Sequence, residues 1–361
     1  MSVYELMHRD KIVAVINTKT GYNKIENAAF MPYSLYLEDV TGVDTAIENI
    51  NNFYYWCATR LLSLDRKYAK ELLNSIGARQ ALTDRDRGNI ALSYRCLSLR
   101  DLYWVREQGE TVLFRSVDLY RHSLNNALVD IALKGKNLTI NNSSLIASDL
   151  STNGLFPKAW LRTNNGFVLL KDGGQSVVYR EYLASELAKC FTTDSLEYRL
   201  SNYQGDPVTE CDIITSLDYS IVAMEDFEIY CTNNDINLHD YVKKLDAVNY
   251  YLMNIIDYLV GNTDRHMGNW GLLINNKTNK PIKLYPLMDF NKSFEAYDSL
   301  EGGRCLTVPG TKTQKAAALE AVEELKGLHL IKAIPENLFI KCNMPNEQSI
   351  FKVRYNLLLK A

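Results

Sequence analysis

One short loop and the segment that follows it carry the side chains best suited to chemistry in this chain. The loop, GNTDRHMGN at 261–269, contains Asp264, His266 and Asn269, and a second carboxylate, Asp289, follows further along. Carboxylate and amide oxygens are hard ligands of the kind that Mg²⁺ prefers, and an aspartate can orient a hydroxyl for attack. This set is what phosphoryl transfer needs, with Asn269 and Asp289 as metal ligands and Asp264 at the hydroxyl.

The segment between Asn269 and Asp289 predicts how their oxygens meet. Apolar runs at 270–274 and 282–288 flank the turn-forming residues NNKTNK, which is typical of an antiparallel hairpin. In an antiparallel hairpin, the residue numbers of each opposing pair add to the same sum. The midpoint of 269 and 289 lies inside the predicted turn, so these two residues are expected to oppose each other. We therefore expect both side chains at the same end of the hairpin, within reach of one cation.

The spacing of Asp264 and Asn269 resembles the D-x-x-x-x-N catalytic loop of protein kinases, and DFN at Asp289–Asn291 resembles their D-F-G metal motif. The local sequence NTDRHMGN is similar to HipA-like bacterial serine/threonine kinases, and DRHxxN also occurs in phosphoinositide-kinase-like enzymes. The resemblance covers roughly residue 145 to the end, and it implies ATP and Mg²⁺ as cofactors. Asn291 departs from the pattern, because D-F-G has glycine there.

Upstream, the pattern predicts the first strands of a kinase N-lobe. SLIASDL, AWLR and FVLLK read as strands, and Asn165–Gly166 is a hairpin signal between the last two. The loop STNGLFPK resembles the HipA-family phosphate loop, although it has only one glycine. The residues that would face phosphates there are Ser151, Thr152, Asn153, Gly154 and Lys158.

Lys171 ends the last of these strands, where the lysine of a kinase reaches the nucleotide phosphates; the alternative is a solvated lysine before a turn. The helix predicted at 176–190 offers it a partner. Glu181 shares a helix face with small residues that can pack on a sheet, and a packed carboxylate needs a partner. Glu186 is the competitor, with bulkier neighbours. We expect Glu181 to pair with Lys171.

Order along the chain places the remaining parts of the site. A strand predicted at 220–224 leads into Glu225, Asp226 and Phe227, the position at which a linker between kinase lobes binds adenine through main-chain groups. A helix predicted over 235–260, ending at Gly261, then delivers the Asp264 loop to the cleft. Its apolar stripe is Leu245, Val248, Leu252, Ile255, Ile256 and Leu259.

His266 and four hydroxyl residues have open roles. We expect His266 to contact a phosphate or to hold the loop rather than to act as the general base, because Asp264 fits that role better. Residues 291–312 occupy the activation-segment position, and hydroxyls there are conceivable phosphorylation sites or merely loop residues. These hydroxyls belong to Ser293, Ser299, Thr307 and Thr311.

The chain before residue 144 is interpreted as an accessory region without a chemical constellation. It combines a β pattern at 1–43, a helical pattern at 45–77, an N-cap at Thr83 for a helix through Leu92, and a strand YWVRE. Its boundary falls between 90 and 145, and a regulatory, partner-binding or supporting role stays open. The predicted fold is α+β: an N-terminal α/β accessory region (1–143), then a two-lobed protein-kinase-like domain with N-lobe 144–226 and C-lobe 227–361.

Composition narrows the classes of partner. The 361 residues suffice for two domains, and the net charge of −3 gives no strong signal for nucleic acid and no polybasic membrane patch. Seven cysteines without a C-x-x-C pattern predict reduced thiols, most of them buried. We find no signal-peptide pattern and no long uncharged apolar run. A cytoplasmic protein is expected, and its oligomeric state stays open.

These observations predict an ATP- and Mg²⁺-dependent kinase that transfers the γ-phosphate to a hydroxyl, with Ser or Thr of a protein, its own chain included, as the first expectation. One alternative is a kinase of a small molecule or lipid headgroup, suggested by DRHxxN. Another is a nucleotide-binding pseudokinase that recruits a partner, against which the intact Lys171, Asp264, Asn269 and Asp289 argue. A toxin–antitoxin role follows from family analogy alone.

Overall fold

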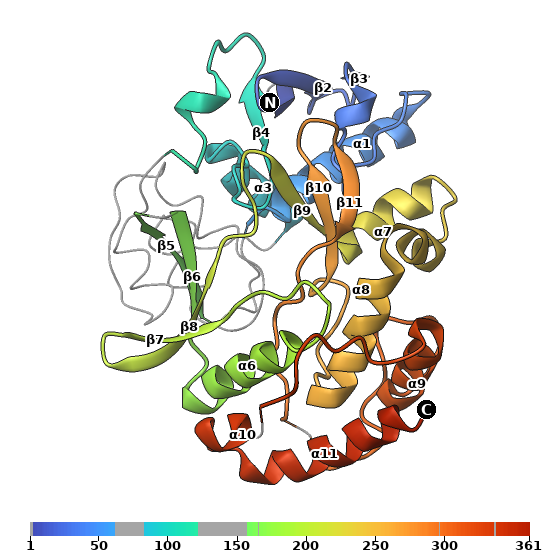
Figure 1. Ribbon diagram of the computed structural model, residues 1–361. Helices are drawn as coiled ribbons and strands as arrows, with labels where there is room; N and C mark the ends of the chain where they lie inside the picture. The colour runs from blue at the N-terminus through green and yellow to red at the C-terminus, as the bar shows by residue number, and fades with distance from the viewer. Residues whose placement is uncertain (1–2, 62–82, 122–156, 165, 296, 336) are drawn as a thin grey trace.

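The computed structural model describes residues 3–61, 83–121, 157–164, 166–295, 297–335 and 337–361. In this part of the chain, three antiparallel sheets follow one another through the molecule, and helices of the C-terminal half gather at the end opposite the N-terminus (Figure 1). The predicted strand SLIASDL and the phosphate-loop residues Ser151, Thr152, Asn153 and Gly154 lie outside the described residues.

The N-terminal region is a four-stranded sheet covered by helices, in the order β3-β2-β1-β4. Its strands are β1 (Val3–His8), β2 (Lys11–Asn17), β3 (Asn23–Ile25) and β4 (Tyr103–Glu107). One face of the sheet packs against helices α1 (Val43–Ala58) and α3 (Asp84–Ser93), where Phe53 and Trp56 complete the core, and Met7 and Trp104 on the other face are buried with Phe114. Short 3₁₀ turns follow at Ala28–Phe30 and Phe114–Ser116. The predicted β element and the strand YWVRE are confirmed; the helical pattern predicted at 45–77 is confirmed as far as Ala58, and residues 62–82 lie outside the described ranges.

Helix α3 begins at the N-cap Thr83 that the sequence predicts, and the structure adds a capping box with Asp86. Thr83 Oγ1 accepts a hydrogen bond from the Asp86 N–H, and the Asp86 carboxylate accepts one from the Thr83 N–H, each at 3.1 Å. Both donors would otherwise lack a partner within the helix.

We expect Thr83→Ala to lower the free energy of unfolding by about 1 kcal/mol, because it removes the capping oxygen. Urea unfolding followed by circular dichroism measures the change, and Thr83→Ser, which keeps the oxygen, is the matched control. Equal stability of the Ala variant and the wild type would show that this helix does not depend on its cap.

The second sheet has the order β5-β6-β8-β7, and α6 (Gln175–Ala188) packs against it. Its strands are β5 (Lys158–Thr163), β6 (Gly166–Lys171), β7 (Arg199–Tyr203) and β8 (Asp206–Asp212). Gly166, in the expected hairpin turn, has φ +125°, a conformation that favours glycine.

The third sheet, β11-β10-β9, lies beside the N-terminal region and next to α8, with the second sheet to one side of it (Figure 1). It consists of β9 (Tyr219–Ala223), β10 (Gly271–Asn275) and β11 (Lys280–Leu284). The sequence predicts that Glu225–Phe227 form the linker that binds adenine; the structure gives these residues helical backbone, and adenine binding at this position stays a prediction. These residues lie in the first turn of α7 (Met224–Asn233), because β9 pairs with β10 rather than with the N-lobe sheet. The link from the second sheet to the third is therefore 213–218.

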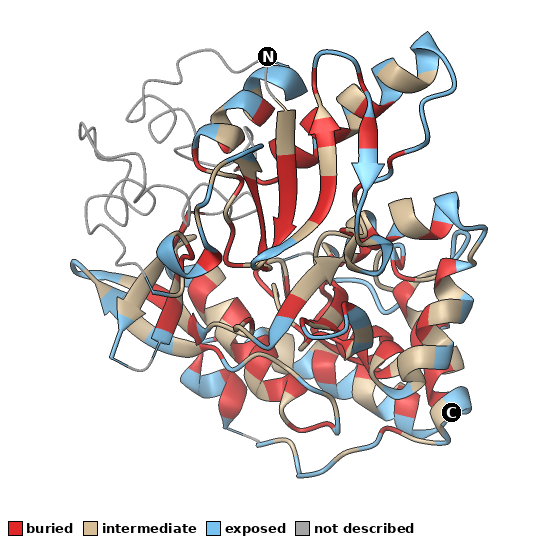
Figure 2. Ribbon diagram, turned by 90° about the horizontal axis from the view of Figure 1, so that it is seen from above, coloured by how far each residue is buried: buried red, intermediate tan, exposed pale blue. Residues whose placement is uncertain are grey.

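The C-terminal part is built around α8 (Leu238–Val260), which packs against β11 and the later helices α9 (Gln314–Leu325), α10 (Leu338–Lys341) and α11 (Pro345–Leu359). Gly261 ends α8 in the left-handed conformation, as expected. Most of the predicted stripe is buried, but Val248 is exposed, because the helix is interrupted at Asp246 (φ −156°). Figure 2 shows buried residues along the strands and on the inner faces of these helices.

Burial also tests the thiols and the loop hydroxyls. All seven cysteines are buried and free of disulfides. Ser293 and Thr307 are buried as well, so a kinase cannot reach them in this conformation; the Thr307 hydroxyl bonds to Asn254 instead.

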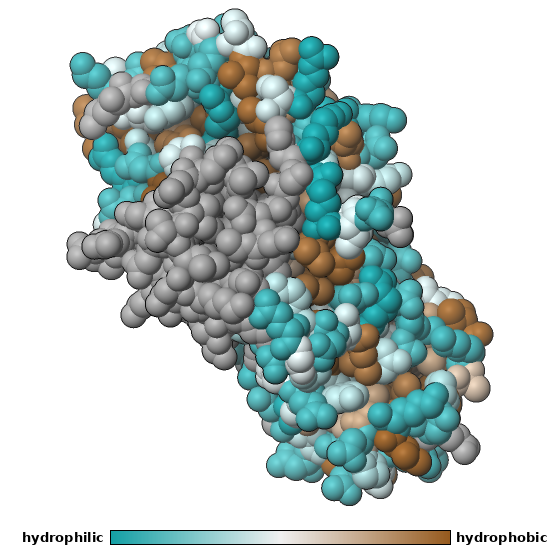
Figure 3. Space-filling view, turned by 90° about the vertical axis from the view of Figure 1, so that its left-hand side faces the viewer, coloured by the Kyte–Doolittle hydropathy of each residue, from teal (hydrophilic) through white to brown (hydrophobic). Residues whose placement is uncertain are grey.

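In the described ranges we find no helix with the length and apolar character that a membrane span requires. On the face drawn in Figure 3, hydrophobic side chains form several separate groups among hydrophilic ones.

Candidate active site

A cavity of about 190 Å³ opens between the second and third sheets. One wall is apolar and comes from β6, β9 and the 213–218 link; the other carries polar groups of the Asp264 loop and the segment after β11. Its lining includes Lys158, Ile213, Thr215, Glu225, Asn269 and Asp289. A concave, mostly apolar pocket with a few converging polar groups is the usual form of a small-ligand site.

Asp289, which lines this cavity, belongs to a cluster of four side chains from different elements, and the other three are buried behind the cavity wall. Lys171 Nζ, at the end of β6, lies 2.6 Å from Glu181 Oε1 on α6 and 3.0 Å from Asp289 Oδ1. It also donates to Tyr198 Oη at 3.1 Å, and the same Oη accepts the Asp289 N–H at 3.1 Å. The second Glu181 oxygen accepts from the Thr209 hydroxyl at 2.6 Å. The expected Lys171–Glu181 contact is present, and Glu186 pairs with Lys189 instead.

The charges in this cluster stabilise one another. Burial disfavours the charge of Lys171, but the Asp289 and Glu181 carboxylates outweigh it and raise the pKa of Lys171 well above its ordinary value. Burial likewise opposes the charge of Asp289, yet Lys171, Lys158 and Arg265 outweigh it and hold the Asp289 pKa far below its ordinary value. Lys171 and Asp289 are therefore both ionised at neutral pH, and the Lys171 ammonium links Asp289 to Glu181 on α6.

The loop that carries Asp264 is held by a buried arginine. Arg265 lies 2.9 and 3.0 Å from the two oxygens of Asp257 on α8, and it donates to the main-chain carbonyls of Asn269 (2.8 Å) and Met288. Asn269 Nδ2 in turn donates to the Asp264 carbonyl at 2.7 Å. One guanidinium thus fixes the loop to both α8 and the segment of Asp289.

Asp264 is partly exposed on this fixed loop; it is not among the residues that line the cavity, whereas His266 and Asn269 of the same loop are. Burial raises the pKa of its carboxyl above the ordinary value; His266 lowers it and Asp289 raises it further. Its main-chain groups bond to Asn262 and Asn269, whereas no hydrogen bond to its carboxylate is found within the described residues. The carboxylate is therefore available to a bound hydroxyl.

The oxygens beside the cavity fit a hard cation. Asn269 donates its amide N–H to the Asp264 carbonyl, and its Oδ1 accepts no hydrogen bond from the described residues. Lys171 and Asn291 both donate to Asp289 Oδ1, so Asp289 Oδ2 likewise accepts no hydrogen bond from the described residues. Asn291 Oδ1 is buried among these residues without a partner as well. No group of three or more His, Cys, Asp or Glu able to hold a metal occurs in the described part. A Mg²⁺ site usually has only one or two protein ligands, and phosphate oxygens of the substrate and water complete the coordination.

The hairpin prediction is confirmed in type but shifted in register. The prediction pairs Leu272 with residue 286, whereas the structure pairs it with Leu284, two residues earlier. A register irregularity follows between Leu273 and Ile274. Asn269 and Asp289 still line the same cavity. Asp289 has φ +61°, a left-handed conformation that aspartate tolerates better than most residues.

The structure distributes the other predicted site residues unevenly. Lys158, Glu225 and His266 line the cavity, and His266 Nδ1 accepts the Gly268 N–H at 3.1 Å. Asp226 faces a smaller cavity on the other side of β9. Phe227 is fully buried against Tyr33 and Tyr230 and does not line the cavity, because α7 packs it into the core.

Sequence reasoning missed Tyr198, Arg265 and Asn291. A signal existed for one of them: Asp257 lies within the apolar part of α8, and a buried carboxylate requires a cation such as Arg265. Asn291 explains the departure from D-F-G, since its amide donates to Asp289 Oδ1 at 2.7 Å. Tyr198 gave no local signal.

We expect Tyr198→Phe to weaken Mg²⁺-ATP binding about tenfold, the equivalent of one buried hydrogen-bonding group left unsatisfied, because the Asp289 N–H loses its acceptor. Isothermal calorimetry with and without Mg²⁺ measures the effect, which should be confined to the Mg²⁺-dependent part. Tyr219→Phe, at an exposed position of β9, is the matched control. Unchanged Mg²⁺-dependence in Tyr198→Phe would exclude a positioning role for the hydroxyl.

The sequence and the fold were compared with those of known proteins. No family model matches the chain. Over 126 residues it is 26% identical to the serine/threonine-protein kinase CtkA of Helicobacter pylori J99, an alignment of 31% of this chain and 38% of CtkA. The chain thus spans less than half the length of the curated relative that it matches.

Two solved structures are similar. HipA of Shewanella oneidensis MR-1, solved with HipB and operator DNA as a toxin–antitoxin system, aligns with 97% of this chain and 91% of its own, at a TM-score of 0.56 and 12% identity. The crystal structure of the Helicobacter pylori proinflammatory kinase CtkA aligns with 56% of this chain and 91% of its own, at a TM-score of 0.43 and 14% identity. The likeness to HipA shows that the chain has a two-lobed, HipA-like kinase fold, and with the sequence match to CtkA the chain resembles the HipA-like serine/threonine kinases.

Proposed function

We propose that this protein is an ATP- and Mg²⁺-dependent kinase that transfers the γ-phosphate to a Ser or Thr hydroxyl of a protein. The observation that carries the proposal is the Lys171 ammonium, shared between Glu181 on α6 and Asp289 after the hairpin, with Asp289 lining a mostly apolar cavity. The sequence similarity to a serine/threonine kinase supports the choice of acceptor.

Each residue has a role that follows from its surroundings. Lys171, oriented by Glu181, would bind the α/β-phosphates, with Lys158 as a second cation near Asp289. Asn269 and Asp289 would hold Mg²⁺, which neutralises phosphate charge when bound. Asp264 would orient the attacking hydroxyl and accept its proton. Such a site works by positioning and by electrostatic stabilisation.

We expect transfer to decline on acidification at a higher pH than an ordinary aspartate would give. The base must be deprotonated, and burial raises the pKa of Asp264, so the active form is full above that raised pKa and is lost as the pH falls through it. A profile of kcat between pH 4 and 8, at saturating nucleotide, measures this. A flat profile down to pH 4 would indicate that no group with a raised pKa limits the reaction.

The experiment that tests the function is incubation of the purified protein with γ-labelled ATP and Mg²⁺, alone and with a protein substrate rich in Ser and Thr, followed by intact mass. Transfer of label to either protein, absent in an Asp264→Asn sample, would support the proposal. Mg²⁺-dependent ATP binding with label found only on small molecules would favour a small-molecule kinase. Binding without any transfer would favour a pseudokinase.

A further inference from the structure

Two residues of the N-terminal region form part of the nucleotide cavity. Leu99 and Arg100 lie between α3 and β4, in the segment to which the sequence assigned no chemistry, yet both line the cavity together with residues of the kinase-like lobes. The accessory region therefore contributes directly to the wall of the candidate active site.

Hydrogen bonds fix this segment at the end of the cavity formed by the 213–218 link. The Leu99 carbonyl accepts from the hydroxyls of Thr215 and of Tyr120, and the Arg100 carbonyl accepts from the Ile221 N–H at 2.9 Å. Thr215 and Ile221 lie on either side of β9's start and also line the cavity. Lys171 and Asp289, in contrast, define the phosphate end.

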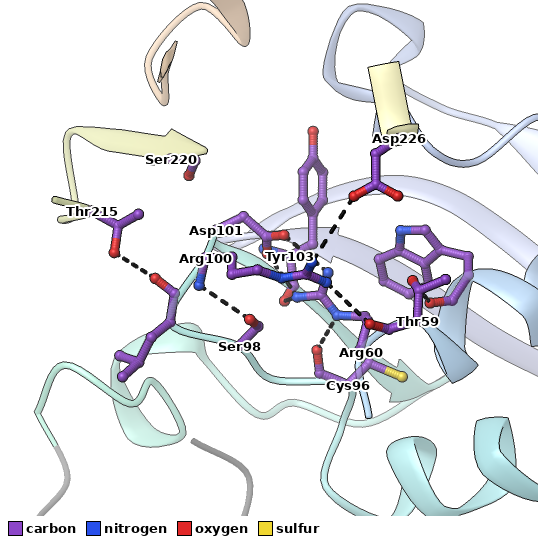
Figure 4. A network of polar contacts seen from close by, with 12 residues as sticks. Thr59, Arg60, Cys96, Ser98, Arg100, Asp101, Tyr103, Thr215, Ser220 and Asp226 are labelled. Atoms are coloured by element: carbon purple, nitrogen blue, oxygen red, sulfur yellow. Dashed lines mark hydrogen bonds and ion pairs between the residues drawn. The ribbon is translucent and has the colours of Figure 1, made fainter. Parts of the chain in front are cut away.

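The Arg100 guanidinium is held from the side away from the nucleotide cavity. Nη2 donates to the Thr59 carbonyl at 3.2 Å, and Nη1 lies 4.0 Å from Asp226, while the neighbouring Asp101 forms a two-pronged ion pair with Arg60 at 2.7 and 2.9 Å (Figure 4). These groups surround a second, smaller cavity, which Arg100 also lines. Arg100 Nε is buried without a hydrogen-bond partner in the described part of the chain.

We propose that Arg100 binds the base and ribose end of the nucleotide, so that the N-terminal region completes the nucleotide site. A planar guanidinium stacks on aromatic rings, and the apolar residues around it, Leu99, Ile213 and Ile221, suit a base rather than a phosphate. Asp226 acts through Arg100 as a positioning residue. This inference rests on the nucleotide site of the proposed function.

The test compares three ligands, each titrated by calorimetry: Mg²⁺-ATP, adenosine, which lacks phosphates, and Mg²⁺-tripolyphosphate, which lacks the base. Arg100→Ala and Arg100→Lys are expected to weaken ATP and adenosine binding by the same factor, about tenfold, and to leave tripolyphosphate binding unchanged, because lysine keeps the charge but lacks the planar face. Arg95→Ala, in the same segment but paired with Glu110, is the matched control and should change none of the three.

Asp226→Asn provides a second, independent variant. It is expected to weaken adenosine binding roughly threefold in the wild-type background and to have no effect in Arg100→Ala, as for residues that act as a unit. Equal binding of ATP and adenosine by Arg100→Ala and by wild type would overturn the inference, as would an equal loss of tripolyphosphate binding. If the wild type itself does not bind ATP, the proposed function fails together with the inference. If the wild type binds ATP and Arg100→Ala binds it equally well, only the inference about Arg100 fails.

Discussion

Asp264→Asn is expected to reduce phosphate transfer by about 10²- to 10⁴-fold, the usual contribution of a positioned general base, while ATP affinity stays within a factor of two to three of wild type. The substitution keeps the size of the side chain. It also leaves the loop intact, because the loop is fixed through the Asp264 main chain and through Arg265 rather than through the carboxylate. The loss should therefore appear in kcat and not in nucleotide binding.

Steady-state transfer of label and calorimetry on the same preparations measure the two quantities. Asp235→Asn is the matched control, since Asp235 is exposed and has φ +53°, which asparagine also adopts. Turnover of Asp264→Asn within threefold of wild type would remove Asp264 from the mechanism. A parallel loss of ATP affinity would assign it to the nucleotide site instead.

The parts of the site that local pattern predicted are those defined by short-range geometry. Gly261 ends α8 and the DRHMGN loop follows at once, so the position of Asp264 depends on a helix end and a few residues. The hairpin, a local element, brings Asn269 and Asp289 to the same cavity. Glu181 lies on the buried face of α6 and pairs with Lys171, whereas Glu186 pairs with Lys189.

The parts that could not be predicted depend on which strands pair. A strand such as β9 has the same residue pattern whether it joins the N-lobe sheet or β10, and this choice decides that Glu225–Phe227 begin a helix rather than a linker. Leu99 and Arg100 reach the cavity through contacts with Thr215 and Ile221, far away in sequence. Single-sequence periodicity carries no information on such pairings.

The Lys171 cluster allows Asp289 to be substituted without leaving a buried charge unpaired. Lys171 keeps Glu181 as a partner at 2.6 Å when Asp289 loses its charge, so the cation is not left uncompensated in the interior. Removal of the lysine itself would instead leave two buried carboxylates side by side, at a cost of about 3–5 kcal/mol. Asp289→Asn is thus the substitution that separates metal binding from folding.

Asp289→Asn is expected to abolish the Mg²⁺-dependent gain in ATP affinity and to bring transfer below detection, because the only carboxylate among the proposed metal ligands is lost. Affinity for ATP in the presence of EDTA should be nearly unchanged, since Lys171 remains. Calorimetry with Mg²⁺ and with EDTA measures both values, and thermal unfolding without nucleotide confirms that the variant is folded.

Asp212→Asn is the matched control for Asp289→Asn. Asp212 also lines the cavity, but its carboxylate pairs with Arg199 at 2.8 Å and is largely exposed. This variant should keep the full Mg²⁺ effect. If Asp289→Asn keeps it as well, Asp289 does not bind the metal, and its role reduces to orienting Lys171. If both variants lose it, the cavity's overall negative charge attracts the cation, and no single carboxylate defines the site.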